Sequence, residues 1–298
     1  MPEKFTLTPE QVANLEEVWG KKTQATEELK SLLEREGREK RAELTGFETE
    51  LINQEEEAWR EVLGVNIDVP KLPAEITPEV RQKLESEGFS LVWLPDLDLL
   101  PDQLERQSPE DYLEELTKKY PNWRPYESLT DSEKNDPKVC RNLEEWFWEK
   151  VKDESCKFPN LPGRWLAVET LAKPAYGDKY QKTGFSKRLA FDDRFSVSWD
   201  DAKGAIDKAE SRFLPDIGLP RGNLRFLEVL EWNLLGNRFD WGATNTYEWT
   251  NTEARGAGES RRLIVGRSAY GGAAYVHWYP PGRADARVGF RVAVEIGS

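Results

Sequence analysis

The chain has 298 residues and a formal net charge of −13 at pH 7. This acidic balance argues against a nucleic-acid-binding protein and against general affinity for anionic membranes, because both partners are held by clustered lysine and arginine. The length predicts two or three structural units, and the sequence shows neither the apolar core of a signal peptide nor a run of about 18 apolar residues that would predict a membrane-spanning helix.

Residues 1–65 are predicted to form a helical hairpin or one long interrupted helix. Thr8, Pro9 and Gln11 supply a capping threonine, a proline at the first helical position and a glutamine three residues after the cap, which together are typical of a helix start. Apolar residues then recur at helical spacing, and Gly37 is the expected break. We expect this region to pack on the rest of the chain rather than to form an oligomerisation stalk.

Residues 66–158 are predicted to be mostly helical. Thr77 and Ser108 each precede a proline and a glutamate and are expected to cap new helices, while residues 89–94 predict a short buried strand. The run 142–151 places Leu143, Trp146, Phe147 and Val151 on one helical face, which indicates core packing rather than a cofactor site.

Residues 159–298 are rich in glycine and tryptophan, and the short β-prone runs WLAVETL, FSVSW, RLIVG, AAYVHWY and GFRVAVEI are expected to form strands. Two helices are expected at 200–213 and 224–235. This mixture predicts an α+β domain with an irregular antiparallel sheet. The two cysteines, Cys140 and Cys156, lie upstream and lack the spacing of metal ligands, so they are expected to be reduced or to form a single bridge.

Five motifs follow one another in this last region: FSVSWDDAKGA (195–205), LRFLEVLEWNLLGN (224–237), TYEWTNT (246–252), RRLIVGRSAYGG (261–272) and VGFRVA (288–293). The series resembles the formylglycine-generating-enzyme branch of the C-type lectin fold, whose members carry comparable V-S-W-x-D-A, R-L-P-T-E-A-E-W, E-W-T, R-G-G-S and G-F-R elements. The resemblance implies a C-terminal C-type-lectin-like domain. The enzymes of this branch need thiols between the last two elements; this chain has no cysteine there, so their thiol chemistry is not expected.

Residues 267–291 contain the only histidine and lack Lys, Glu, Gln, Asn, Thr and Met. The segment resembles the variable region of a protein diversified by a retroelement, in which template adenines are copied with mutation. Template AAC codons then become NNC codons, which can encode Tyr, His, Ala, Pro, Gly, Arg or Asp but never Lys, Glu, Gln, Met or Trp. The resemblance implies that the diversified, ligand-binding positions are Tyr270, Ala273, Tyr275, His277, Tyr279, Pro280, Gly282, Arg283, Ala284, Asp285, Ala286 and Arg287. It implies fixed scaffold at Gly271, Gly272, Val276, Trp278, Pro281 and residues 288–291.

The alternation of residue types fits this division. In an extended strand, Tyr275, His277 and Tyr279 would face one side and Val276 and Trp278 the other. Tyrosine with arginine, aspartate and glycine is a paratope-like mixture. The plain alternative is a core strand with buried tyrosines. A lone His277, without a cysteine, histidine or paired carboxylate nearby in sequence, is expected to be a contact residue rather than a base or metal ligand.

Acidic and glycine-rich stretches elsewhere have ordinary explanations. Asp192, Asp193, Asp200 and Asp201 are expected to cap a helix rather than to form a glycosidase pair or a calcium site. The run 254–260 is expected to connect a hairpin, because it lacks the lysine of a phosphate loop. No cofactor is expected, although the resemblance allows a structural calcium or magnesium ion without naming its ligands.

The sequence therefore predicts a non-enzymatic display protein that binds a protein or another macromolecular surface, without nucleic-acid binding or membrane insertion. A virion or cell-surface location is expected from the resemblance. Two alternatives stay open: a divergent, cysteine-free enzyme with an acidic pocket, and a structural tail protein that buries the aromatic segment in an oligomer.

Overall fold

The structure is a computed structural model that describes residues 30–32, 35, 44–134, 136, 138–256 and 259–297. The chain divides into two compact units, Met1–Glu50 and Leu51–Ser298. In the first unit, residues 44–50 are helical, and the helix start predicted at Thr8 and the break predicted at Gly37 lie outside the described residues. The second unit begins with a helix over residues 51–63 and holds everything discussed below.

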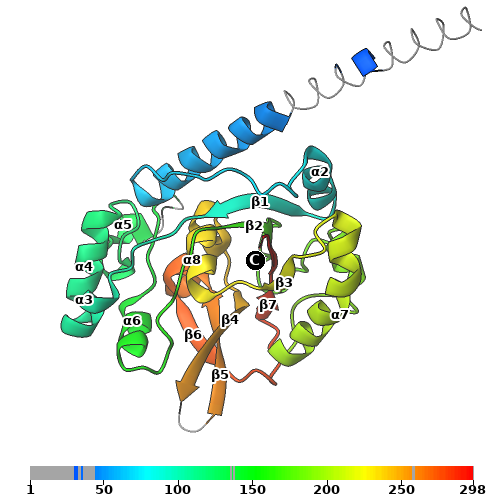
Figure 1. Cartoon of the computed structure of the whole chain (residues 1–298). Helices are drawn as coiled ribbons and strands as arrows, with labels where there is room; N and C mark the ends of the chain where they lie inside the picture. The colour runs from blue at the N-terminus through cyan, green and yellow to red at the C-terminus, as the bar shows by residue number, and fades with distance from the viewer. Residues whose placement is uncertain are drawn as a thin grey trace, which may run out of the picture. The chain divides into compact units, whose positions relative to one another are not determined.

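Two sheets organise the described part of the second unit (Figure 1). The first has the order β1 (Phe89–Leu94), β2 (Arg164–Glu169), β8 (Val292–Glu295), β3 (Asn223–Phe226), and every neighbouring pair is antiparallel. The second has the order β6 (Val276–Tyr279), β5 (Glu259–Gly266), β4 (Tyr247–Gly256), β7 (Val288–Phe290). In this sheet β4 and β7 are parallel and the other pairs are antiparallel.

Helices pack on these sheets and on one another. α2 (Pro78–Ser86) packs on β1, α7 (Trp199–Ile217) on β3, and α8 (Val229–Arg238) on β4 and β5. α3 (Pro101–Arg106), α4 (Pro109–Lys119) and α6 (Glu145–Lys152) pack together, and α5 (Asp131–Lys134) is a single short turn. Short 3₁₀ turns are η1 (Tyr126–Ser128), η2 (Phe185–Arg188), η3 (Trp241–Ala243), η4 (Ser268–Tyr270) and η5 (Gly272–Ala274). The α+β prediction is confirmed.

Local sequence signals explain the helix starts. The Thr77 hydroxyl accepts a hydrogen bond from Val80 N, and the Ser108 hydroxyl accepts one from Asp111 N, so both predicted caps are confirmed. Each satisfies a backbone donor that the first turn leaves without a partner. The strand predicted at 89–94 is confirmed as β1.

Two predicted elements were wrong. FSVSW, expected to be a strand, is irregular, and its Ser198 caps α7 by accepting from Asp201 N; the hydroxyl offers the backbone an alternative to strand pairing. The helix predicted at 224–235 splits into β3 and α8, because Glu228 and Glu231 form a capping box that starts the helix only after Glu228.

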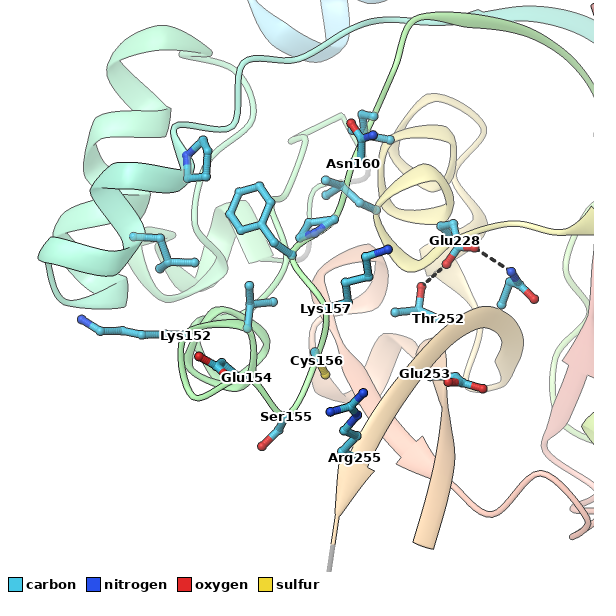
Figure 2. A pocket seen from close by; sticks show the side chains of 18 of the residues that line it. Lys152, Glu154, Ser155, Cys156, Lys157, Asn160, Glu228, Thr252, Glu253 and Arg255 are labelled. Atoms are coloured by element: carbon cyan, nitrogen blue, oxygen red, sulfur yellow. Dashed lines mark hydrogen bonds between the residues drawn. The ribbon is translucent and has the colours of Figure 1, made fainter. Parts of the chain in front are cut away.

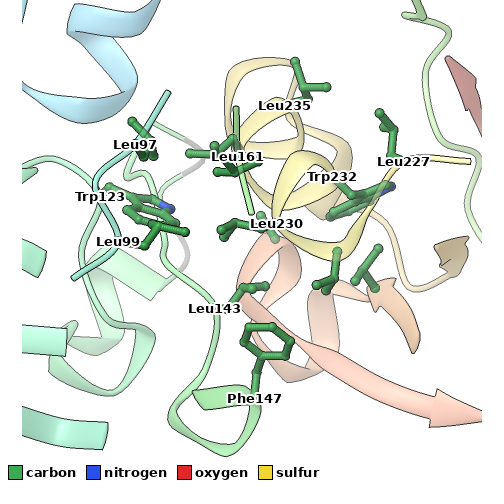
Figure 3. Packing of buried hydrophobic residues seen from close by; sticks show 14 of the residues in the cluster. Leu97, Leu99, Trp123, Leu143, Phe147, Leu161, Leu227, Leu230, Trp232 and Leu235 are labelled. Carbon is green, nitrogen blue, oxygen red and sulfur yellow. The ribbon is translucent and has the colours of Figure 1, made fainter. Parts of the chain in front are cut away.

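One hydrophobic core crosses the boundary at residue 158 that the sequence suggested. Figure 3 shows Trp123, Leu143 and Phe147 from the middle region beside Leu230 and Trp232 of α8. These side chains are fully buried, so the middle region and the last region stabilise each other. Cys140 and Cys156 are free thiols.

Candidate functional site

Strand β6 lies at an edge of the second sheet and carries the aromatic residues singled out in the sequence. It pairs with β5, with His277 opposite Ile264 and Tyr279 opposite Arg262. Val276 is buried, His277 is exposed, and Tyr279 is partly exposed. The alternation of faces along β6 therefore follows the period of an extended strand.

Aromatic side chains from two segments stack in a row beside β6. The Tyr270 and Tyr275 rings are 5.0 Å apart at 26°, and the Tyr275 and His277 rings are 6.4 Å apart at 17°. The Arg267 guanidinium lies 4.4 Å from the Tyr270 ring centroid and closes the row. Its own position is fixed, because Arg267 donates to Asn245 Oδ1 (2.7 Å) and to the Tyr247 hydroxyl (2.9 Å). Stacking of this kind adds about 0.5–1.5 kcal/mol for each aromatic pair.

The loop 280–287 adjoins the row through Tyr279. The Tyr279 hydroxyl donates to Asp285 Oδ2 (3.0 Å), and the Arg283 guanidinium lies 5.2 Å from the Tyr279 ring. Asp285 also accepts from Arg287 N (2.8 Å), so its carboxylate organises the loop from within. Tyr270, Tyr275, His277, Tyr279 and the loop 280–287 are together called the aromatic face below.

Most candidate ligand-binding positions lie on this face with exposed or partly exposed side chains. Tyr270 is 48% exposed. His277, Gly282, Arg283, Ala284, Ala286 and Arg287 are also exposed, whereas Tyr275, Tyr279, Pro280 and Asp285 are half-buried. None of these three tyrosines is fully buried, in contrast to the alternative in which they form a core strand.

Ala273 is an exception and corrects the sequence assignment. Its side chain is 2% exposed, and its carbonyl accepts from the Asn233 amide (2.7 Å). A Cβ added to Gly242 would come within 2.4 Å of Ala273 N. Residue 273 is therefore packed from two sides and offers no contact surface.

The predicted scaffold positions are mostly buried. Gly271 and Gly272 have φ values of +128° and +63°, a region that favours glycine, and they turn the chain from η4 into η5. Val276 and residues 288–291 are buried. Trp278 is half-buried against Trp146, with ring centroids 5.8 Å apart, and under the Arg261 guanidinium at 4.8 Å. Pro281 is half-buried in the loop.

A buried ionic network behind the aromatic face joins three of the sequence motifs. Glu248 of β4 accepts from Trp232 Nε1 (2.6 Å), from the Tyr180 hydroxyl (2.6 Å) and from Arg291 at 3.0 and 3.1 Å. Burial alone would raise the pKa of Glu248, but the charges of Arg291 and Lys173 and these hydrogen bonds hold it below its usual range. The motifs around Trp232, Glu248 and Arg291 thus serve the frame that carries the face.

Lys173 is the cation of this network that loses its charge at the lowest pH. Its ammonium donates to Thr246 O (2.7 Å), and burial beside Arg291 lowers its pKa to about 7 despite the attraction of Glu248. The group is 4% exposed, so it has no route to a substrate and acts as packing for the turn after β5.

A second buried carboxylate fastens the edge of β6. Glu144, the residue before α6, accepts from Val276 N at 3.0 Å, and its own backbone N–H donates to Ala274 O at 3.1 Å. Burial raises the pKa of Glu144 to about 7, and the nearby charge of Glu127 adds to this shift. The pKa of His277 shifts in the other direction. Partial desolvation of its ring and the positive charge of Arg261 lower this pKa, which favours the neutral imidazole at pH 7.

Sequence reasoning missed three aromatic residues beside the face. Tyr176 is 56% exposed, and the Arg287 guanidinium lies 5.2 Å from its ring. Tyr126 contacts Gly271, since a Cβ there would lie 3.3 Å from the ring, and Lys134 sits 5.1 Å from that ring. Tyr247 packs 6.0 Å from Tyr275. Only folding brings these residues together, so no spacing signal in the chain could have found them.

Two of the four acidic residues considered for catalysis, Asp193 and Asp201, have structural roles. Asp193 Oδ1 accepts from the backbone N–H of Arg194 and Phe195, and Asp201 lies in the capped first turn of α7. Within the described residues, no group of three or more His, Cys, Asp and Glu side chains is arranged to hold a metal ion. No helix among those residues is both long and apolar enough to span a membrane.

Comparisons with known proteins give no family. Neither a family model nor a curated protein matches the chain. A solved structure titled "Crystal Structure of CarF" matches 47% of this chain and 89% of its own length, with 14% sequence identity and a TM-score of 0.32. A similarity at this TM-score carries no argument about the fold or the function.

Proposed function

We propose that the chain is a non-enzymatic display protein of the retroelement-diversified kind, and that its aromatic face binds a macromolecular target, as in receptor binding or adhesion at a virion or cell surface. The C-type-lectin-like identity of residues 159–298 is part of this proposal. The observation that carries it is the distribution of exposure along residues 267–291: Tyr270, His277, Arg283 and Arg287 are exposed, whereas Val276 and residues 288–291 are buried.

The chemistry of the face supports recognition rather than catalysis. Tyrosine and arginine form large contact areas at low conformational-entropy cost, and rows such as Arg267–Tyr270–Tyr275 are already ordered by stacking before a partner arrives. His277 has a stacked tyrosine as its ring neighbour. Two acids that line the cavity beside α3 and β4, Glu253 and Glu295, are ion-paired, and the charges of Arg225 and Arg164 lower the pKa of Glu295 despite its burial.

The first test is the DNA beside the gene. Diversification by a retroelement requires a near-identical repeat that differs from codons 270–287 almost only where the template has adenine. A repeat whose differences fall on the exposed positions, and spare Ala273 and Val276, would support the proposal. A complete gene neighbourhood without such a repeat would refute the retroelement part of it.

The second test is a display experiment. Positions 275, 277, 279, 283, 284, 286 and 287 are randomised with NNC codons, and the library is selected for protease resistance and then for binding to a model protein such as lysozyme. A control library of the same design randomises the exposed α7 positions 207, 208, 211 and 212. We expect folded binders mainly from the first library; equal yields from both, or loss of folding in most members of the first, would contradict a display role.

A further inference from the structure

A cavity of about 990 Å³ opens where the middle region meets the base of the second sheet (Figure 2). Its walls come from α3, from the segment 151–164, from the start of α8, and from β4 and β5. The cavity contains none of the candidate ligand-binding positions, so nothing about it depends on the proposed function. Its volume lies at the upper end of the range for small-molecule sites, which is about 300–1,000 Å³.

The inner wall of this cavity is made of polar side chains that already have partners. Glu295 pairs with Arg164 at 2.6 Å and with Arg225 at 2.9 Å, and Arg225 also forms two hydrogen bonds with the buried Glu231. Glu228 accepts from Asn251 (2.7 Å) and from Thr252 (2.6 Å), the contacts drawn as dashed lines in Figure 2. Glu231 and Glu295 balance the two arginines, whereas Glu228 has only neutral partners and keeps its negative charge.

Two cations at the mouth differ from that wall. Lys157 and Arg255 are exposed, and their segments are joined by the bridge between Cys156 and Ala254. Figure 2 shows the two side chains on either side of Cys156. Among the side chains that the structure describes, neither cation forms an ion pair with a carboxylate, whereas the neighbouring Arg262 is paired with Glu253 at 2.7 Å.

The charge of the lining stands out against the rest of the chain. Six lysines and arginines face five glutamates in the cavity (Lys152, Lys157, Arg164, Arg225, Arg255 and Arg262 against Glu105, Glu154, Glu228, Glu253 and Glu295), whereas the whole chain has 42 cations against 55 acids. Glu105 and Glu154 belong to α3 and to the end of α6. An anion is therefore favoured at the Lys157 and Arg255 end.

An apolar floor completes the cavity. The exposed Pro101 and the half-buried Phe158 and Pro159 line it, with Leu104, Leu161 and Leu230 packed beneath them. Contact with these side chains removes apolar ligand surface from water, which is worth about 25 cal/mol for each Å². A ligand that has both an apolar body and a charged head uses the floor and the mouth together.

We propose that this cavity binds an amphiphilic anion, a carboxylate or phosphate group on an apolar body, with the head held by Lys157 and Arg255 and the body over Pro101, Phe158 and Pro159. Charge-assisted hydrogen bonds from an ammonium and a guanidinium are the stronger class of hydrogen bond and suit both head groups. The inner ion pairs fix the wall so that the head is not drawn deeper.

The test is isothermal titration calorimetry of the full chain with four probes of one chain length: octanoate, octyl phosphate, octanol and octylamine. We expect one-to-one binding of at least one anion, weaker binding of octanol, and none of octylamine. The tighter anion identifies the head group. The double variant Lys157→Ala/Arg255→Ala should bind that anion about tenfold more weakly, as expected for loss of a charged hydrogen bond.

The matched control is Lys182→Ala/Arg212→Ala, which removes the same charge from exposed positions outside this cavity and should bind as the parent does. Circular dichroism melts of all three proteins show whether each is folded; if the alanine pair is unfolded, Lys157→Gln/Arg255→Gln replaces it. Absence of binding by both anions at millimolar concentration, octanol binding as tightly as octanoate, or an equal loss in the control would each overturn the proposal.

Discussion

The two sides of the second sheet near β6 are built from the same short stretch of chain and yet tolerate different residues. On the inner side, Val276 is buried in the same core cluster as Trp232, and Arg291 is buried and donates to Glu248. On the outer side, Tyr270 and His277 are exposed to solvent, and the ring of each stacks on the ring of Tyr275. The difference teaches that the buried network fixes the backbone on which the aromatic face stands, because packing errors there would move every side chain in front.

The largest effect is expected from breaking that network. Glu248→Ala leaves Arg291 and Lys173 buried without their counter-charge, and loss of one partner of a buried pair costs about 3–5 kcal/mol of unfolding free energy. Glu253→Ala, on the same strand but with its carboxylate 60% exposed, should cost less than about 1 kcal/mol. Urea unfolding of both variants checks this; similar losses would mean that the inner and outer sides do not differ as described.

The next largest effect is expected from a change in pH, through the buried carboxyl group of Glu144. The pKa of Glu144 is raised from 4.5 to about 7 in the fold, so the folded state binds the proton more tightly and its stability falls as pH rises from 4.5 through 7. The expected fall in unfolding free energy is up to about 3 kcal/mol. Glu144→Gln keeps an acceptor for Val276 N and should flatten this dependence, as measured by unfolding between pH 4.5 and 8. A variant with the parent's slope would assign the effect elsewhere.

Two alanines inside the candidate segment test where the boundary between the sides lies. Ala273→Tyr must force a ring into a site closed by Gly242 and Asn233, and overpacking of this kind costs about 1–3 kcal/mol. Ala284→Tyr places the same ring in solvent and should change stability by less than about 0.5 kcal/mol. Thermal unfolding distinguishes them. If Ala273→Tyr left the stability of the fold unchanged, residue 273 would again be a candidate ligand-binding position.

The smallest effects are expected on the face itself. Tyr275→Ala removes stacking with two neighbours and should cost about 1 kcal/mol, while His277→Ala and Tyr176→Ala should stay within about 0.5 kcal/mol. Denaturant titration measures these differences. A loss near the about 3–5 kcal/mol typical of a core aromatic would show that the face is part of the core.

The sequence predicted those parts of the molecule that depend on local signals. Caps at Thr77 and Ser108 and the alternation around Val276 are short-range patterns, and the structure confirms them. The strand expected at FSVSW failed because one hydroxyl, Ser198, starts a helix there. A β-prone composition cannot reveal such competition.

Long-range features were out of reach of the sequence. The burial of Ala273 depends on Asn233, which also accepts from Trp123 Nε1 at 2.8 Å, and these residues lie far apart in the chain. Likewise, Tyr176 joins the face only because the loop that carries it packs beside Arg287. Which residues of the candidate segment are exposed is therefore decided by contacts between distant segments.

The carboxylate of Glu144 has one more consequence, which concerns self-association. Val276 N points away from β5, and an open strand edge of this kind readily recruits a strand from another molecule. By occupying that donor, Glu144 denies it to a second chain. This single contact therefore removes one of the backbone donors through which the edge of β6 could pair with a strand of another molecule.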